Sequence, residues 1–212
     1  MNPRTVREEI AGPAGRIECA FDRPQDGARG IAVVCHPHPQ FGGTLDNKVV
    51  QTIARAFHQL GWASLRFNFR GVGKSEGSWD DGHGEVDDAL AVVRAARERA
   101  EFAPLPLALA GFSFGGYVAA AAADRLPAAE KPLRLVLVGP STQKQTVPVV
   151  PADTVVVHGE SDDVVPLAAT LDWARPQTLP VIVLPGVGHF FHGRLALLKG
   201  VLVRELHELA AV

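Results

Sequence analysis

The chain of 212 residues contains only two cysteines, and neither sign of charge is in clear excess. Cys19 and Cys35 cannot build a disulfide framework, and both lie in apolar runs where we expect small buried residues. A formal net charge of -2 offers no basic surface for nucleic acid. No apolar run reaches the roughly 18 residues that a membrane-spanning helix needs. The first residues, "MNPRTVREEIAGP", lack the apolar core of a secretory signal. These absences predict a cytoplasmic protein that binds neither nucleic acid nor membrane.

The residues that are abundant predict one globular domain over 1–212. Hydrophobic residues make up 47% of the chain, enough for a sizeable core. We find no internal repeat, low-complexity tract or long linker. A single α/β domain is therefore the expected organisation.

Apolar strand-like runs alternate with helix-like runs along the chain. We predict an N-terminal hairpin from residues 4–10 and 16–21, then strands at 30–36, 63–69, 105–111, 133–139, 154–159 and 180–186, with helices at 47–60, 85–99, 115–126 and 195–209. Continuously apolar strands that alternate with helices indicate a mostly parallel, twisted sheet with helices on both faces. The hairpin adds an antiparallel edge.

The segment "RFNFRGVGKSEG" raises the question of a nucleotide site. Gly73, Lys74 and Ser75 match the end of a phosphate-binding loop, but the first glycine of that pattern is replaced by Asn68. The residues after Ser75, "EGSWDDGHGE", are polar and rich in glycine, so no helix can begin there. Without a helix N-terminus the loop lacks the free N–H groups that bind phosphate. We therefore expect no nucleotide at this loop.

The segment "GFSFGG" predicts a nucleophile elbow at Ser113. It has the pattern Gly-x-Ser-x-Gly between a predicted strand and a predicted helix, which is the context that this motif requires. Gly111 and Gly115 lack side chains, so strand and helix can approach closely enough for the tight turn. None of the other serines is flanked in this way.

A serine hydroxyl needs a base, and the base needs a carboxylate that orients it. In this type of fold the order along the chain is serine, acid, histidine. Asp162 and Asp163 follow one predicted strand, and His189 follows the next. Gly186 and Gly188 allow the tight loop that would turn His189 inward, which favours it over His192. The sequence thus supplies a complete catalytic triad.

The chain resembles the α/β-hydrolase superfamily over nearly its whole length. It is most similar to small, lidless bacterial members that carry a His-Pro-His-Pro motif. The resemblance rests on "HPHPQFGGT", "RFNFRGVGKSEG", "GFSFGG", "HGESDDVVP" and "GVGHFFHG". It implies an α/β-hydrolase fold without a lid domain and a serine hydrolase that needs no cofactor. It also assigns the acid to Asp162 rather than Asp163, and a role in loop geometry to Arg70 and Ser75.

An oxyanion hole needs two backbone N–H donors. One is expected from Phe114, directly after the nucleophile, and the other from the loop that begins at His36. Pro37 and Pro39 have no N–H, so His38 is the predicted donor and Gln40 the alternative. A metal site at the paired histidines is disfavoured because no carboxylate or cysteine stands at a matching spacing.

These residues predict hydrolysis of carboxylic esters or thioesters. Only Gly139 to Ala152 separate two strands where relatives with narrow specificity insert a lid, so we expect an open site and small or short acyl groups. Phe41, Phe112 and Phe190 are candidates for an apolar substrate-binding wall, with core packing as the alternative. The expected partner is a small-molecule ester, with no metal and no cofactor.

Other functions are not excluded by these motifs. A peptidase of the same fold would use the same triad, and a lyase or transferase could reuse the elbow. A binding module with an inactive triad belongs to a different class. The sequence also leaves a homodimer open, through an edge strand or the final helix.

Overall fold

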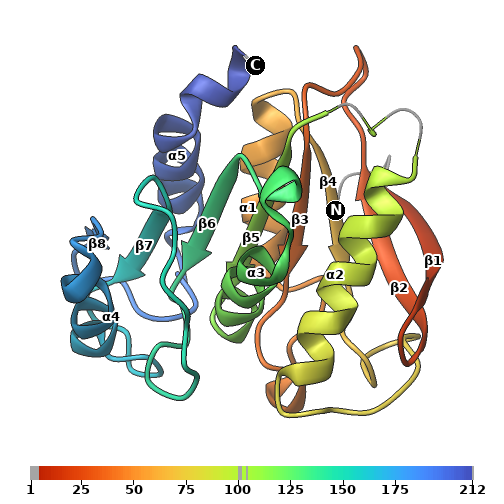
Figure 1. Cartoon of the computed structure of the whole chain (residues 1–212). Helices are drawn as coiled ribbons and strands as arrows, with labels where there is room; N and C mark the ends of the chain where they lie inside the picture. Colours follow the sequence, from red (N-terminus) through yellow and green to blue (C-terminus); the bar gives the residue numbers. More distant parts are fainter. Residues whose placement is uncertain (1–4, 100–101, 104, 212) are drawn as a thin grey trace.

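The computed structural model describes residues 5–99, 102–103 and 105–211. These residues form one sheet of eight strands in the order β1-β2-β4-β3-β5-β6-β7-β8 (Figure 1). The strands are β1 Val6–Gly12, β2 Gly15–Asp22, β3 Ile31–Cys35, β4 Ala63–Phe67, β5 Leu107–Phe112, β6 Arg134–Val138, β7 Val155–Gly159 and β8 Ile182–Leu184. The six strands β3 to β8 are parallel to one another, while β2 pairs antiparallel with both β1 and β4. The predicted parallel sheet with an antiparallel N-terminal hairpin is therefore confirmed.

Helices cover both faces of this sheet, as predicted. They are α1 Lys48–Gln59, α2 His83–Arg97, α3 Phe114–Arg125, α4 Leu167–Ala174 and α5 Leu195–Glu205. Side chains of α1 and α5 pack into the core on one face, and those of α2 and α3 pack into the core on the other. Strand side chains alternate between the two cores, because successive residues point to opposite faces.

Two elements differ from the sequence prediction. Helix α4 was not predicted, because its eight residues are too few for a clear helical repeat and bury only Thr170 and Ala174. The final leucine repeat was predicted as one helix to Leu209, but α5 ends at Glu205 and a 3-10 turn follows. In that turn Leu209 is still buried, and its carbonyl accepts a hydrogen bond of 2.9 Å from the indole N–H of Trp62.

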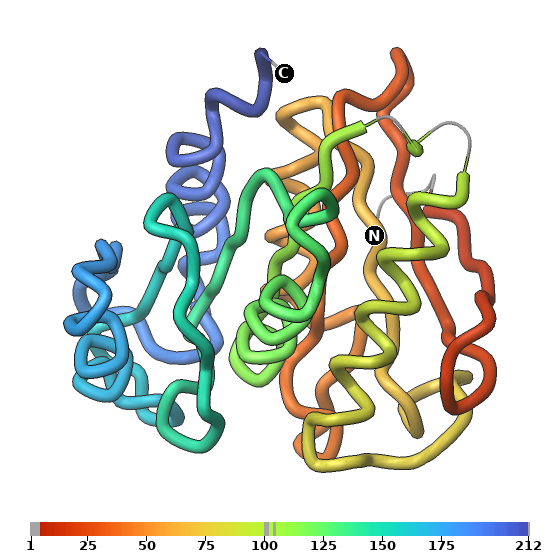
Figure 2. The backbone as a smooth tube through the Cα atoms, in the orientation of Figure 1, coloured from red at the N-terminus to blue at the C-terminus, as the bar shows by residue number. Residues whose placement is uncertain are grey.

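The segment that joins β6 to β7 contains no helix, so no cap covers the sheet edge at this point. Figure 2 traces this segment to the edge where the loop after β3 also lies. The expectation that the fold lacks a lid domain is thereby confirmed. Within the described part of the chain, no helix combines the length and apolar character needed to cross a membrane.

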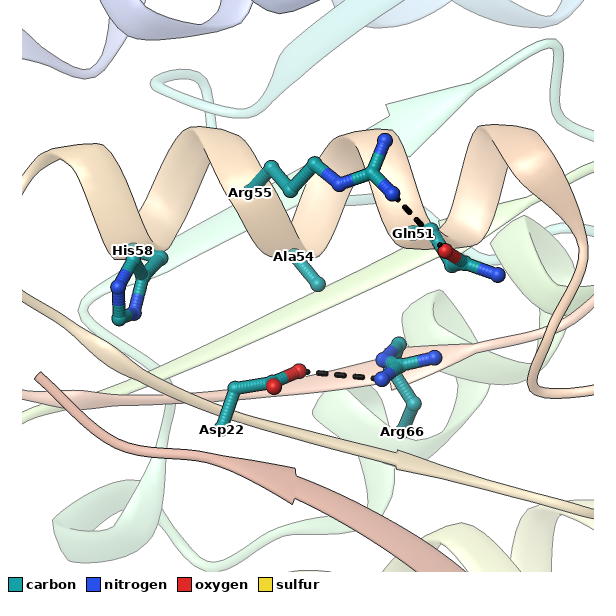
Figure 3. Close-up of a pocket in the computed structure, with 6 residues that line it drawn as sticks. All are labelled: Asp22, Gln51, Ala54, Arg55, His58 and Arg66. Atoms are coloured by element: carbon teal, nitrogen blue, oxygen red, sulfur yellow. Dashed lines mark hydrogen bonds and ion pairs between the residues drawn. The ribbon is translucent and has the colours of Figure 1, made fainter. Parts of the chain in front are cut away.

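A charged cavity of about 260 Å³ lies between α1 and strands β2 and β4 (Figure 3). At its floor the buried guanidinium of Arg66 lies 3.0 Å from Asp22 Oδ2, and it donates to the carbonyl of Leu45 at 3.0 Å. Gln51 and His58 of α1 line the opposite wall. Because a buried arginine needs such partners, this pair ties the hairpin to the parallel part of the sheet.

Candidate active site

Ser113 lies at the turn between β5 and α3. Its backbone has φ 57° and ψ -120°, a strained conformation for a residue other than glycine. A Cβ at Gly111 would lie 1.9 Å from Gly115 O, and a Cβ at Gly115 would lie 2.4 Å from Cys35 O. Both positions therefore require glycine, and the close contact of strand and helix raises the Ser113 hydroxyl above the sheet edge.

His189 and Asp162 reach the same edge from the loops after β8 and β7. His189 Nε2 lies 3.0 Å from Ser113 Oγ, and His189 Nδ1 lies 2.6 Å from Asp162 Oδ2. All three residues are buried, with exposed fractions between 3% and 8%. The structure thus brings the three predicted side chains together in the order hydroxyl, imidazole, carboxylate. With Nδ1–H donated to the carboxylate, Nε2 is free to accept the serine proton.

The Asp162 carboxylate is held in its charged form. Burial alone raises its pKa, but the hydrogen bonds from His189 and from the N–H groups of Val165 (2.7 Å) and Val164 (2.9 Å) outweigh burial and leave the pKa below its usual value. The neighbouring Asp163 is exposed and lies outside this network. Of the two aspartates left open by order and spacing, the structure brings only Asp162 to the imidazole.

His158 stands behind the aspartate, a position that the sequence did not reveal. Its Nε2–H donates to Val165 O at 2.9 Å and lies 3.4 Å from Asp162 Oδ2. The ring is fully buried, and burial lowers its pKa, so it stays neutral. This geometry is that of a hydrogen-bonded structural histidine, and its contact with the Asp162 carboxylate was not predicted. The only signal was its spacing of four residues from Asp162.

The loop after β3 supplies the candidate oxyanion donors. Gln40, the alternative donor, gives its N–H to His38 Nδ1 at 3.3 Å. Among the described residues neither the His38 N–H nor the Phe114 N–H has an acceptor, and Phe114 begins α3, where an N–H lacks a partner within the helix. His38, Phe114 and Ser113 line one cavity, so both N–H groups belong to residues beside the hydroxyl.

His36 fixes this loop from below. Its Nε2 accepts the N–H of Phe69 at 3.0 Å, and its Nδ1–H donates to Pro37 O at 2.6 Å. The ring is fully buried, and this burial lowers the pKa of His36 to about 3. A neutral His36 therefore links the loop after β3 to the segment after β4.

Acidification is expected to destabilise the fold through His36. Its pKa lies near 3 in the folded state and near 6.5 when unfolded, so the unfolded chain binds the extra proton. The contribution of His36 to the free energy of unfolding is fully present above about pH 6.5. As the pH falls from there to about pH 3, this contribution decreases by up to about 1.4 kcal/mol per pH unit. The free energy of unfolding, measured by urea between pH 7 and pH 4, should therefore decrease less steeply with falling pH in His36→Gln than in the wild type. The control is His207→Gln, because His207 is exposed. An equally steep decrease in His36→Gln and in this control would contradict the prediction.

The segment from Asn68 to Gly77 is held by local hydrogen bonds. Ser75 Oγ donates to Asn68 O at 2.7 Å, and Arg70 forms a paired contact with Asp88 at 2.8 and 3.0 Å. The next helix, α2, begins only at His83. Arg70 and Ser75 are thus tied into local hydrogen bonds, as expected.

Two cavities flank Ser113. The smaller, of about 40 Å³, is lined by His38, Phe41, Ser113, Phe114, Ser141, Gln143, Lys144, Val164 and Val165. The larger, of about 300 Å³, is lined by Pro37, His38, Phe41, Gly42, Gly43, Asn47, Ser113, Lys144, Val164, His189 and Phe190. Only the larger includes the His189 imidazole. The sequence contained no signal for this division, because it depends on how separate loops meet.

The three phenylalanines of the predicted substrate-binding wall lie in different surroundings. Phe41 and Phe190 line the larger cavity and are 77% and 45% exposed. Phe112 is fully buried, with its ring centroid 4.8 Å from that of His189. As the last residue of β5 it packs into the core against the His189 ring, and it lines neither cavity beside Ser113. The prediction for Phe112 was therefore wrong, and core packing was the correct alternative.

Metal-ion sites and cysteine nucleophiles are the two other sources of hydrolytic chemistry considered for this chain. The described residues contain no group of three or more histidine, cysteine or acidic side chains that could hold a metal ion. Cys19 and Cys35 are unpaired and buried, and burial raises the pKa of both thiols, that of Cys19 to about 12. Neither cysteine can act as a thiolate nucleophile in this state.

Comparison with known protein families identifies relatives of this chain. A family model described as serine aminopeptidase, S33, matches residues 28–152, a range that includes Ser113 but ends before Asp162 and His189. An uncharacterized protein of Rickettsia prowazekii is 41% identical over 116 residues. The match covers 55% of this chain and 48% of that protein. An uncharacterized Mycobacterium tuberculosis protein is 28% identical over 191 residues, 66% of its own length.

Solved structures extend the similarity to the whole domain. A serine hydrolase without a lid from Xanthomonas campestris is 36% identical, with a TM-score of 0.89 over 98% of this chain and 96% of that chain. A serine hydrolase homologue from Coxiella burnetii is 39% identical, with a TM-score of 0.83 over 95% and 97% of the two chains.

Proposed function

Because the chain belongs to the serine aminopeptidase S33 family of α/β serine hydrolases, we propose that it cleaves carboxylic esters or thioesters of small acyl groups. The observation that supports this most directly is the separation of 3.0 Å between His189 Nε2 and Ser113 Oγ. A hydroxyl at this distance from a neutral imidazole can transfer its proton as it attacks a carbonyl.

The proposed reaction proceeds through an acyl-enzyme. Ser113 Oγ bonds to the carbonyl carbon while its proton moves to His189 Nε2, and the N–H groups of Phe114 and His38 hold the negative oxygen. His189 then protonates the leaving oxygen or sulfur, and that bond breaks. Water attacks the acyl group, gives its proton to His189, and Ser113 leaves with that proton. Asp162 orients the imidazole and balances its positive charge throughout.

The two cavities suggest where each part of the substrate lies. The leaving group must lie beside His189, because that imidazole protonates it. We therefore assign the leaving group to the larger cavity and the acyl group to the smaller one, which excludes His189. A cavity of about 40 Å³ holds roughly three water-sized groups, which matches an acetyl or propionyl chain.

The family description favours an aminopeptidase as the second candidate. Such an enzyme has to bind the positively charged N-terminal amine of a peptide. Among the described residues no carboxylate lines either cavity, whereas Lys144 lines both. A site with this charge repels an amine, so esters are the preferred class.

A panel of aryl esters graded by acyl length tests the proposal. We expect kcat/KM to be highest for acetyl and propionyl esters and to fall by roughly tenfold or more at octanoyl, because a long chain does not fit the smaller cavity. Val165→Ala, which widens that cavity, should move the optimum to longer chains. Val149→Ala serves as the control, since Val149 is 78% exposed and lines neither cavity. A preference for long chains, or faster cleavage of amino acid anilides, would refute the assignment.

A further inference from the structure

The segment between β6 and β7 carries a lysine beside Ser113. The N–H of Ser141 donates to Ser113 O at 3.1 Å, and the indole N–H of Trp173 donates to Val147 O at 3.1 Å. Lys144 lies in the turn between these two anchors. Its backbone is therefore held relative to the nucleophile, while its side chain is exposed.

The Lys144 side chain extends across the mouth of the site. It lines both cavities, and its Nζ lies 5.6 Å from the centroid of the Phe41 ring. Phe41 belongs to the loop after β3, so this cation–π contact joins two loops on opposite sides of Ser113. Within the described residues Lys144 forms no ion pair with a carboxylate. Its ammonium group is thus available to a ligand in the cavities.

The charges around the two cavities favour an anion. Asp162, the nearest acid of the triad, is buried behind His189 with both oxygens engaged. Asp163 is exposed and lines neither cavity. His38 is kept neutral because burial and the charge of Lys144 both lower its pKa. Of the described lining residues, Lys144 alone therefore carries a full charge outside the triad.

A second donor lines the larger cavity. Asn47 Oδ1 accepts the N–H groups of Val49 and Val50 at the start of α1, at 2.9 and 3.4 Å. Its Nδ2 has no acceptor among the described residues. The ammonium group of Lys144 can only donate hydrogen bonds, and Asn47 has only its N–H2 left to offer because its oxygen is already engaged. Two such donors beside one cavity suit a carboxylate or phosphate oxygen, which accepts hydrogen bonds.

We propose that Lys144 is a specificity-determining residue that binds a carboxylate or phosphate on the leaving group of the substrate. The inference rests on the proposed ester hydrolysis and on the assignment of the leaving group to the larger cavity. An anionic leaving group contacts Lys144 there while its ester carbonyl lies at Ser113. Lys144 then exchanges its contact with Phe41 for a charged hydrogen bond, and it takes no part in proton transfer.

Two aryl acetates of similar shape test this inference. In 4-acetoxybenzoate the leaving group carries a carboxylate, and in 4-acetoxybenzamide it is neutral. We expect Lys144→Met to raise KM and lower kcat/KM for the benzoate by roughly tenfold, the range of a hydrogen bond to a charged group, and to leave the benzamide within about twofold. Lys144→Arg should restore kcat/KM for the benzoate. In the wild type, about 0.5 M salt should lower the ratio of kcat/KM for the benzoate to that for the benzamide. Lys199→Met on α5 is the matched control, because Lys199 lines neither cavity.

Three outcomes would overturn the inference. The first is an equal loss for both acetates, or no loss for either, in Lys144→Met. The second is a preference for phenyl hydrogen succinate, whose acyl group carries a carboxylate, over the neutral phenyl butyrate, without any preference between the two acetates. This result would place the anion on the acyl group rather than on the leaving group. The third is no turnover of any ester by the wild type, which would refute the proposed function itself. The first outcome, together with normal wild-type turnover of the benzamide, would overturn the inference and leave the proposed function standing.

Discussion

Ser113→Ala is expected to lower kcat/KM for an acetyl ester by at least about a thousandfold, because the attacking oxygen is removed while the rest of the site is kept. The fold should be retained, since Ser113 Oγ forms a hydrogen bond only with His189 among the described residues, and alanine keeps the turn between Gly111 and Gly115. Ester turnover and covalent labelling by a fluorophosphonate probe measure the loss. Both should disappear together, with the melting temperature nearly unchanged.

The control for this variant is Ser78→Ala, because Ser78 is exposed and lines neither cavity. It should keep wild-type turnover and labelling. Residual turnover of Ser113→Ala that still labels with the fluorophosphonate would show that another side chain attacks the carbonyl. Unchanged turnover in Ser113→Ala would remove the basis of the proposed function.

His38→Pro is expected to lower kcat by about 100- to 1000-fold relative to His38→Ala, because proline removes one oxyanion donor. Both variants lose the ring, so their ratio isolates the N–H. The backbone of His38 has φ -51°, which is within the range of proline, and its N–H has no acceptor among the described residues. The substitution is therefore expected to cost little stability.

Kinetics of the two variants with an acetyl ester, together with urea unfolding, separate catalysis from stability. The expected pattern is a low kcat in His38→Pro with a KM and an unfolding midpoint close to those of His38→Ala. Equal kcat values in the two variants would assign the second donor to another group. A much lower unfolding midpoint in His38→Pro would instead indicate that the loop requires this N–H for folding.

Features set by local sequence were predictable. The turn at Ser113 depends on Gly111 and Gly115, and their sequence spacing alone indicates the close contact that the structure shows. The order of strands and helices followed from apolar runs, and the strand-end positions of Asp162 and His189 followed from that order. The polar, glycine-rich residues after Ser75 likewise indicated that no helix begins there, and α2 begins only at His83.

Features set by contacts between distant segments were not predictable. Phe112 and Phe190 look alike in the sequence, but the pleat of β5 buries the first and the loop after β8 exposes the second. The contact of His158 with Asp162 depends on how the loop after β7 folds back. The division of the site depends on Lys144 and Phe41 meeting from loops about a hundred residues apart, which no local pattern encodes.

The uncovered edge beside Ser113 also bears on the fate of an acyl group once it is attached there. Because the segment between β6 and β7 contains no helix that could cover the cavities, water would approach the carbonyl of the proposed acyl-enzyme through the larger cavity, which includes His189. Water is far more concentrated than a dilute alcohol and would therefore attack that carbon first. The proposed acyl-enzyme would then release a free acid rather than form a new ester.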